Sequence, residues 1–155
     1  MRRWWADPPR DAYPENELDK YRARIHGLDE DTAIFFIRQR GRPIGFIQCY
    51  RIDDHDEYGT ALALDVPAAG IDVFIGEPSE IGKGVGPVAI RAFLRDVVFA
   101  RYDVDECVIG PSVMNTNAIR AYEKAGFVWF KDAKVPDEPD PEHLMRIRRN
   151  KVVGS

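Results

Sequence analysis

A glycine-rich stretch between residues 81 and 87 has the composition of a loop that binds an anion. It reads Ile-Gly-Lys-Gly-Val-Gly-Pro. Glycine lacks a Cβ, so the backbone can turn tightly and approach a ligand closely. An amphipathic run begins at Val88, and the helix that it predicts would direct free N–H groups and the positive end of its dipole at the loop. These residues therefore predict a cradle for phosphate.

Three kinds of phosphate-binding loop compete for this stretch. The P-loop requires Ser or Thr after its Lys, but Lys83 is followed by Gly84. Residues 84–89 match the glycine pattern of dinucleotide-binding folds. That fold requires a loop directly after a strand and an acid ending the next strand, whereas residues 76–80 intervene here and the next predicted strand ends in Gly110. The third pattern, x-x-Gly-x-Gly at a helix start, fits residues 82–86.

A carboxylate, an amide and two phenols are further residues able to do chemistry. Asp72 interrupts an apolar run, and a carboxylate there needs a partner or a function, since isolated burial is costly. Gln48 and Tyr50 share a strand face with Phe46, which either lines a site or is a half-buried sheet face. Tyr122 is either a proton donor, with an ordinary pKa of ~10, or a core aromatic residue of an amphipathic helix.

No metal centre is expected from the remaining reactive residues. The segment 53–58 has four carboxylates and His55, but no further spaced ligand, so it is predicted to be a solvated loop. Cys49 and Cys107 lie in apolar runs. They are predicted to be buried free thiols of a cytoplasmic protein rather than a disulfide.

Length and composition predict a single domain over residues 1–155. The chain is 45% hydrophobic, enough for a packed core. No apolar run approaches the ~20 residues of a membrane helix, and the N-terminus is not a secretory signal. A net charge of −4 disfavours nucleic acid and favours a cationic partner. The sequence leaves monomer and homodimer open.

The elements that would position these residues alternate between strands and helices. A helix is predicted from Pro14 to Gly27, a second from Val88 and a third over 118–125, capped by Asn115–Asn117 and ended by Gly126. Strands are predicted over 32–38, 44–50, 71–75, 105–110, 127–130 and 144–148. Helices connecting strands of a mixed sheet make the fold α/β or α+β.

Two segments resemble the GCN5-related N-acetyltransferase (GNAT) superfamily. They are Ile81–Gly86 and, more specifically, Asn115–Phe127, within a resemblance that runs from about residue 34 to residue 147. Superfamily members usually carry Gln or Arg where Ile81 stands. The resemblance implies a GNAT fold, with a mixed, mostly antiparallel central sheet flanked by helices. The chain starts almost at Trp4–Trp5, so we expect it to lack the usual first strand and helix or to be truncated.

The resemblance also implies acetyl-CoA as the cofactor. A backbone N–H of the strand Val73–Ile75 would meet the thioester carbonyl, and Tyr122 would sit beside the coenzyme thiol. The implied cofactor-binding residues are Val73, Phe74, Ile75, Gly82, Lys83, Gly84, Val85, Gly86, Asn115, Ala118 and Tyr122.

Within the superfamily the chain is most similar to aminoglycoside 6′-N-acetyltransferases, through Trp4–Trp5 and the segments 44–50, 70–77 and 82–84. This similarity implies acetylation of a primary amine of an aminoglycoside, the 6′-amine, which confers antibiotic resistance. Asp72 and Tyr122 would be catalytic. The implied substrate-binding residues are Trp5, Gln48, Tyr50, Asp72 and Glu77.

One departure concerns the acceptor site, because those enzymes carry a second acid where this chain has Gly110. A drug contact is then missing or comes from elsewhere, for which the acidic segment Asp53–Glu57 is one source. Acetylation of a lysine-like metabolite, a siderophore precursor or a protein amine is the alternative activity. A non-catalytic module that binds coenzyme A is the alternative from another class.

Overall fold

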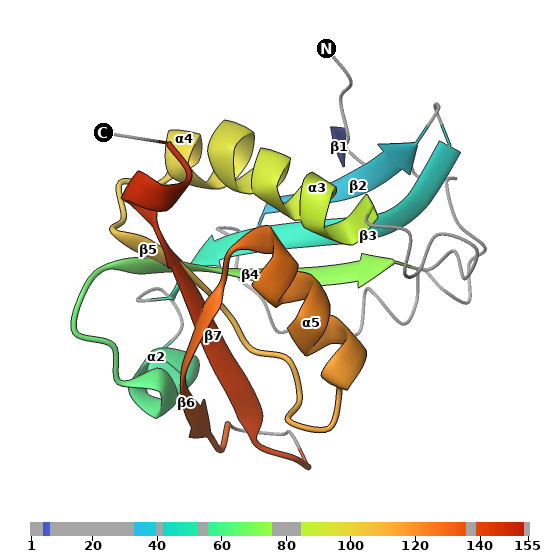
Figure 1. Cartoon of the computed structure of the whole chain (residues 1–155). Coiled ribbons are helices and arrows are strands. Elements are labelled where there is room, and N and C mark those ends of the chain that lie inside the picture. The colour runs from blue at the N-terminus through green and yellow to red at the C-terminus, as the bar shows by residue number, and fades with distance from the viewer. Residues whose placement is uncertain are drawn as a thin grey trace.

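The computed structural model of the chain describes residues 5–6, 33–39, 42–52, 56–75, 85–135 and 139–153 (Figure 1). The helix predicted from Pro14 to Gly27 lies outside these residues. So do Glu77 and the first part of the glycine loop, including Gly82, Lys83 and Gly84.

The described strands form one seven-stranded sheet in the order β1-β2-β3-β4-β5-β7-β6. Only the β4–β5 pair is parallel. This arrangement confirms the predicted sheet, mixed but mostly antiparallel. The strands are β1 (Trp5–Ala6), β2 (Ala33–Gln39), β3 (Arg42–Arg51), β4 (Ala68–Ile75), β5 (Glu106–Ile109), β6 (Val128–Ala133) and β7 (Glu142–Arg148).

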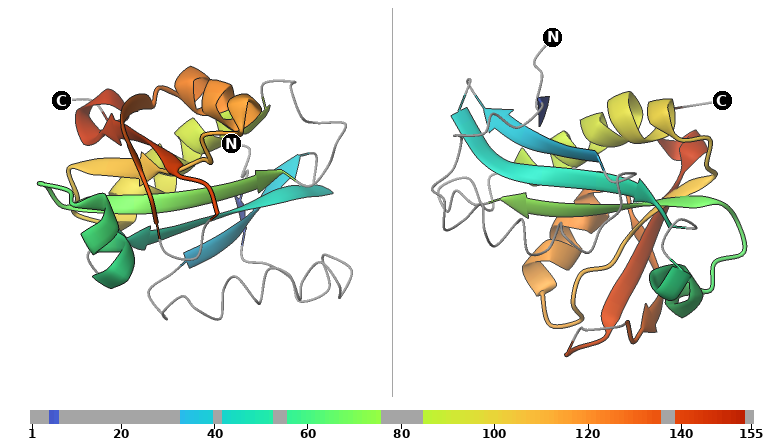
Figure 2. Two further views of the ribbon diagram at one scale, coloured as in Figure 1. Left: turned by 90° about the horizontal axis from the view of Figure 1, so that it is seen from below. Right: turned by 180° about the vertical axis from the view of Figure 1, so that it is seen from behind.

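Helices lie on both faces of the sheet, as Figure 2 shows: α3 and α5 on one face and α2 on the other. They are α2 (Asp56–Leu62), α3 (Val85–Phe93), which continues through a π-helical turn (Leu94–Val98) into α4 (Phe99–Arg101), and α5 (Thr116–Ala125). A 3₁₀ turn (Arg149–Lys151) follows β7. Among the described helices, none is long and apolar enough to cross a membrane.

Two helix boundaries differ from the prediction. Residues 56–58 were predicted to be loop, but they open α2. Helix α3 begins at Val85 rather than Val88, so Gly86 and Pro87 lie in its first turn. Proline is tolerated there because the first-turn N–H groups have no intrahelical acceptor.

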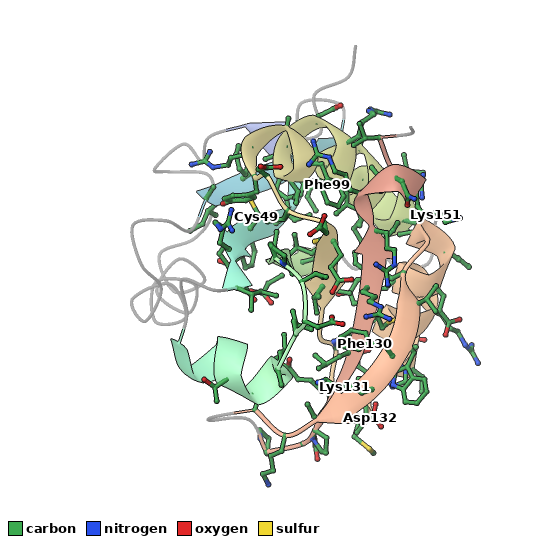
Figure 3. The ribbon with its side chains drawn as sticks, turned by 90° about the vertical axis from the view of Figure 1, so that its left-hand side faces the viewer. Cys49, Phe99, Phe130, Lys131, Asp132 and Lys151 are labelled. Atoms are coloured by element: carbon green, nitrogen blue, oxygen red, sulfur yellow. The ribbon has the colours of Figure 1, made fainter. Side chains whose placement is uncertain are left out.

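The core is divided between the two faces of the sheet. The larger cluster joins α3 and α5 to the sheet and includes Phe93, Phe99 and the two cysteines, Cys49 and Cys107 (Figure 3). Both cysteines are free and buried, as predicted. Burial raises the pKa of the Cys49 thiol to about 11.

The smaller cluster lies on the face that carries α2 and contains Tyr50, Ile52, Leu62, Ala68, Val108, Val135 and Leu144. Lys131 of β6 donates a hydrogen bond to the carbonyl of Leu62 at the end of α2, which fastens this helix to the far edge of the sheet (Figure 3).

Candidate active site

The two parallel strands at the centre of the sheet part after a short pairing. Their register runs from Ala68↔Glu106 to Gly70↔Val108. On its other side β4 remains paired with β3 as far as Ile75. Among the described strands, the edge of β4 that faces β5 therefore has no partner beyond Gly70, and backbone donors and acceptors on this edge can bind an extended ligand that contains amides. Val73, Phe74 and Ile75 belong to this stretch of β4.

The first turn of α3 follows this strand in the chain and contributes free backbone donors. Val85 and Gly86 are its first two residues, and Gly86 is buried. Pro87 lacks an N–H, so the donors of this turn belong to its neighbours. A helix N-terminus with a buried glycine suits a phosphate group, because the backbone can approach it closely.

Helix α5 has the predicted caps at both ends. Asn115 is the N-cap, and its side-chain oxygen accepts a hydrogen bond of 3.1 Å from the N–H of Ala118. Gly126 ends the helix with φ 109°, a conformation that favours glycine. Asn115 and Ala118, which the resemblance placed at the cofactor, thus bond to each other.

Tyr122 lies in the middle of α5 and is half-buried against the larger core cluster. Its ring meets Phe127 edge to face, with 6.4 Å between the ring centres. Burial, and secondarily the negative charge of Asp72, raises the pKa of Tyr122 to about 12. The phenol is therefore protonated at neutral pH.

Arg91 joins α3 to α5 and to the C-terminal segment. Its guanidinium donates to the carbonyl of Ala125, at 3.0 Å, and to the carbonyl of Lys151, at 3.1 Å. Both acceptors are backbone groups near the end of a helical segment, where a cation is favourable. This contact fixes the helix that carries Tyr122 relative to the helix that starts at the glycine loop.

Gln48 and Asp72 lie opposite each other on β3 and β4. The amide of buried Gln48 donates a hydrogen bond of 2.7 Å to the carboxylate of exposed Asp72. Among the described residues, Oε1 of Gln48 is buried and has no hydrogen-bond partner. A buried acceptor without a donor is costly. Asp72 and Gln48 together therefore offer acceptor oxygens that a bound amine would satisfy.

Tyr50 and Gly70 form the next pair on the same face, one step further into the sheet. A Cβ on Gly70 would lie 2.6 Å from the Tyr50 ring, so a side chain at residue 70 would displace the ring. Tyr50 is buried and belongs to the smaller core cluster.

Glu142 was not among the predicted site residues, but its side chain lies over Gly110. A Cβ on Gly110 would be 2.2 Å from Oε1 of Glu142 and 3.2 Å from Leu144. The carboxylate thus occupies the space that a side chain at residue 110 would fill. The contact depends on how β7 lies beside β5, and no local sequence signal points to it.

Other predicted site residues are only partly described. The backbone of Trp5 pairs with Ile37, which places β1 at the edge of the sheet beside β2. Glu77 lies outside the described residues, so its placement is not part of the site above. Within the described ranges, no group of three or more His, Cys, Asp or Glu side chains is arranged to hold a metal ion.

Comparison with known proteins identifies the family. The model of the acetyltransferase (GNAT) domain matches residues 1–135. An aminoglycoside N(6′)-acetyltransferase type 1 of Klebsiella pneumoniae is 32% identical over 136 residues, which cover 88% of this chain and 67% of the relative. The chain therefore belongs to the GNAT acetyltransferase family.

Two further relatives extend this comparison. A kanamycin resistance protein of Rhizobium radiobacter is 37% identical over 75 residues, which cover 48% of this chain and 68% of the relative. The crystal structure of aminoglycoside acetyltransferase AAC(6′)-Ib with coenzyme A and kanamycin has a TM-score of 0.67 and 27% identity. The match covers 95% of this chain and 81% of that chain.

Proposed function

We propose that this protein transfers the acetyl group of acetyl-CoA to a primary amine of an aminoglycoside, the 6′-amine, and thereby confers resistance to the antibiotic. The observation that carries the acceptor assignment is the pair Gln48–Asp72, with its buried acceptor oxygen, beside the point where β4 and β5 part. The aminoglycoside acetyltransferases among its relatives support the same activity.

The donor site comprises the open edge of β4 and the first turn of α3. The residues present fit acetyl-CoA, because the strand edge offers hydrogen bonds to amides and the helix N-terminus favours phosphate. The residues that would hold it are Val73, Phe74 and Ile75 of β4, Val85 and Gly86 of α3, and the preceding loop residues Gly82, Lys83 and Gly84. Acetyl-CoA supplies an acetyl group activated as a thioester.

In the acceptor site, Asp72 supplies the negative charge and Gln48 holds its carboxylate in position. In the reaction a C–N bond forms to the amine and the C–S bond breaks, and the amine loses a proton. Carboxylates are in general much weaker bases than amines. Asp72 therefore orients the amine, and water carries the proton away. Gln48 holds the Asp72 carboxylate in place and accepts a further hydrogen bond from the amine.

Tyr122 acts on the leaving sulfur. A phenol with a pKa of about 12 is a weaker acid than a thiol near ~8.5. Complete proton transfer from Tyr122 to the thiolate is thus unfavourable. We assign Tyr122 the role of a hydrogen-bond donor that stabilises the developing negative charge.

We also propose that residues 1–155 form a single domain that works in the cytoplasm, as a monomer or a homodimer. One continuous sheet spans the described residues, and both cysteines are free, as is usual for proteins of that compartment.

The activity is tested by thiol release from acetyl-CoA with kanamycin, tobramycin, a lysine derivative or a peptide as the acceptor. Release with the two aminoglycosides and acetylation at the 6′-nitrogen support the proposal. Release only with the lysine derivative or the peptide would replace it by the alternative activity. Coenzyme binding without turnover of any amine would indicate a non-catalytic module.

A further inference from the structure

The described part of the chain places a second carboxylate on the other side of the gap between β4 and β5. Gly70 and Val108 are the last paired residues of these two strands. Asp72 and Gly110 follow two residues later, and in a strand such residues return to the same face of the sheet. Glu142, whose carboxylate lies over Gly110, therefore lies on the same face of the sheet as Asp72, on the other side of the gap.

Both carboxylates lie on the same face of the sheet. A Cβ added to Gly110 would lie close to Leu144, and Leu144 belongs with Tyr50 to the smaller core cluster. Tyr50 covers Gly70, two residues before Asp72. Gln48 on β3, Asp72 on β4 and Glu142 on β7 thus lie on the face that carries α2, with β5 between β4 and β7.

The backbone around Glu142 is held firmly beside the end of β5. Glu142 forms a bridge with Ser112, and the N–H of His143 donates to the carbonyl of Pro111 at 2.7 Å. The N–H of Val113 donates to the carbonyl of Pro141 at 3.1 Å. These contacts set the position of the side chain, which is half-buried and reachable from solvent.

We infer that Glu142 is a second acceptor-binding carboxylate and that the site selects amines with at least two ammonium groups. This inference rests on the proposed function. Neighbouring strands lie ~4.8 Å apart where they pair, and β5 lies between β4 and β7, so the two carboxylates come from strands about 10 Å or more apart. A polyamine can therefore place its reacting amine at Asp72 and a second ammonium group at Glu142. A monoamine gains nothing from Glu142.

The test measures binding calorimetrically, since this readout does not depend on turnover. Kanamycin is titrated into the protein saturated with coenzyme A. The variant Glu142→Gln keeps the side-chain shape and is expected to bind kanamycin about tenfold more weakly, the loss expected for one charged hydrogen bond. The control is Asp103→Asn, which removes one exposed carboxylate before β5, at the opposite end of this strand from Gly110. It is expected to bind as the wild type does.

A second variant moves the carboxylate without removing it. In Gly110→Ala the new Cβ would displace Oε1 of Glu142, so kanamycin binding is expected to weaken although the charge remains. The monoamine probe is methyl 6-amino-6-deoxyglucoside, whose KM in the thiol-release assay is expected to be equal in the wild type and in Glu142→Gln. The KM for acetyl-CoA and the thermal midpoint show that both variants retain the fold.

The outcomes separate this inference from the proposed function. Equal kanamycin affinity in the wild type and Glu142→Gln would overturn the inference, as would an equal loss in Asp103→Asn. Binding by the wild type without thiol release would overturn the proposed function alone, and the ratio of affinities would still decide the role of Glu142. Failure of the wild type to bind kanamycin would overturn both.

Discussion

The amide of Gln48 donates a hydrogen bond of 2.7 Å to the carboxylate of Asp72 across the β3–β4 pair. Gln48 is buried and Asp72 is exposed, so the inner residue fixes the orientation of the outer one. An acceptor amine then meets a carboxylate that is already held in one position, which reduces the entropy lost on binding.

Replacing Gln48 is expected to weaken acceptor binding. In Gln48→Ala the KM for kanamycin should rise about tenfold, because the carboxylate loses its orienting donor and the amine loses an acceptor. The KM for acetyl-CoA should not change, and steady-state kinetics with each substrate varied in turn distinguish the two. An increase confined to the KM for acetyl-CoA would contradict the assignment of Gln48 to the acceptor side.

Gly86 should be required for donor binding. Gly86→Val places a branched side chain in the first turn of α3, where the backbone must approach phosphate, and the KM for acetyl-CoA should rise at least about tenfold. The control is Val88→Ala on the same helix, since Val88 is exposed at 55%. An unchanged KM in folded Gly86→Val would rule out the phosphate site at this turn.

Tyr122 should affect turnover rather than binding. Tyr122→Phe removes the hydroxyl and should lower kcat about 100-fold, the usual effect of losing one donor to a developing negative charge. Because the pKa of Tyr122 is about 12, the phenol stays protonated, and the ratio of wild-type to variant kcat should be constant between about pH 6 and about pH 10. A ratio of wild-type to variant kcat that falls toward one as the pH approaches 10 would show that the pKa of the phenol lies far below about 12.

Glu106 should make the folded state less stable as the pH rises. Its carboxyl is fully buried, and burial raises its pKa, an effect that attraction to Arg146 and Arg148 offsets only in part. A group whose pKa is higher in the folded state than in the unfolded state stabilises the fold fully at a pH below its unfolded-state pKa. This stabilisation is lost as the pH rises through its folded-state pKa.

Urea unfolding should therefore show a loss of stability in the wild type as the pH rises above about 4.5, the ordinary value for this group. Glu106→Gln should remove this loss, because the amide cannot ionise. Glu123→Gln, on the exposed side of α5, should keep the wild-type profile. Parallel profiles for the wild type and Glu106→Gln would show that Glu106 does not titrate differently in the two states.

Arg91 should stabilise the fold through the two carbonyls that it joins. Arg91→Ala is expected to lower the free energy of unfolding by about 1–2 kcal/mol, as partly exposed hydrogen bonds to a charged group are lost. The matched control is Arg95→Ala one turn later, because the Arg95 guanidinium pairs with exposed Asp96 beside it. Chemical denaturation should detect a loss only in the first variant. Equal losses would assign the effect to helix α3 and not to its contact with α5.

Features fixed by neighbouring residues could be predicted from the sequence. Asn115 and Gly126 bound α5 as expected, because each cap depends on a few adjacent residues. The strands of the sheet were located for the same reason, through their apolar runs. Helix α2 was missed because its seven residues include Gly59 and because, among its described side chains, only Leu62 is fully buried, which produces no helical period.

Features that depend on register could not be predicted. The bond between Gln48 and Asp72 requires the antiparallel alignment of β3 with β4. The contact of Glu142 with Gly110 requires β7 to lie beside β5, although the two residues are far apart in the chain. The side chains of the acidic segment 53–57, which the sequence suggested as the source of another carboxylate, lie outside the described ones, so this suggestion stays a prediction.

The parallel pairing of β4 with β5 ends after three residue pairs, and this brevity links enzyme stability to supply of the donor. A molecule bound along the open edge would provide hydrogen bonds that the described strands do not make with each other beyond Gly70. Any ligand that binds only the folded state raises the free energy of unfolding as its concentration rises. The lifetime of the folded enzyme in the cell would then increase with the acetyl-CoA concentration. A cell with abundant acetyl-CoA would retain more of the folded enzyme than a cell with little.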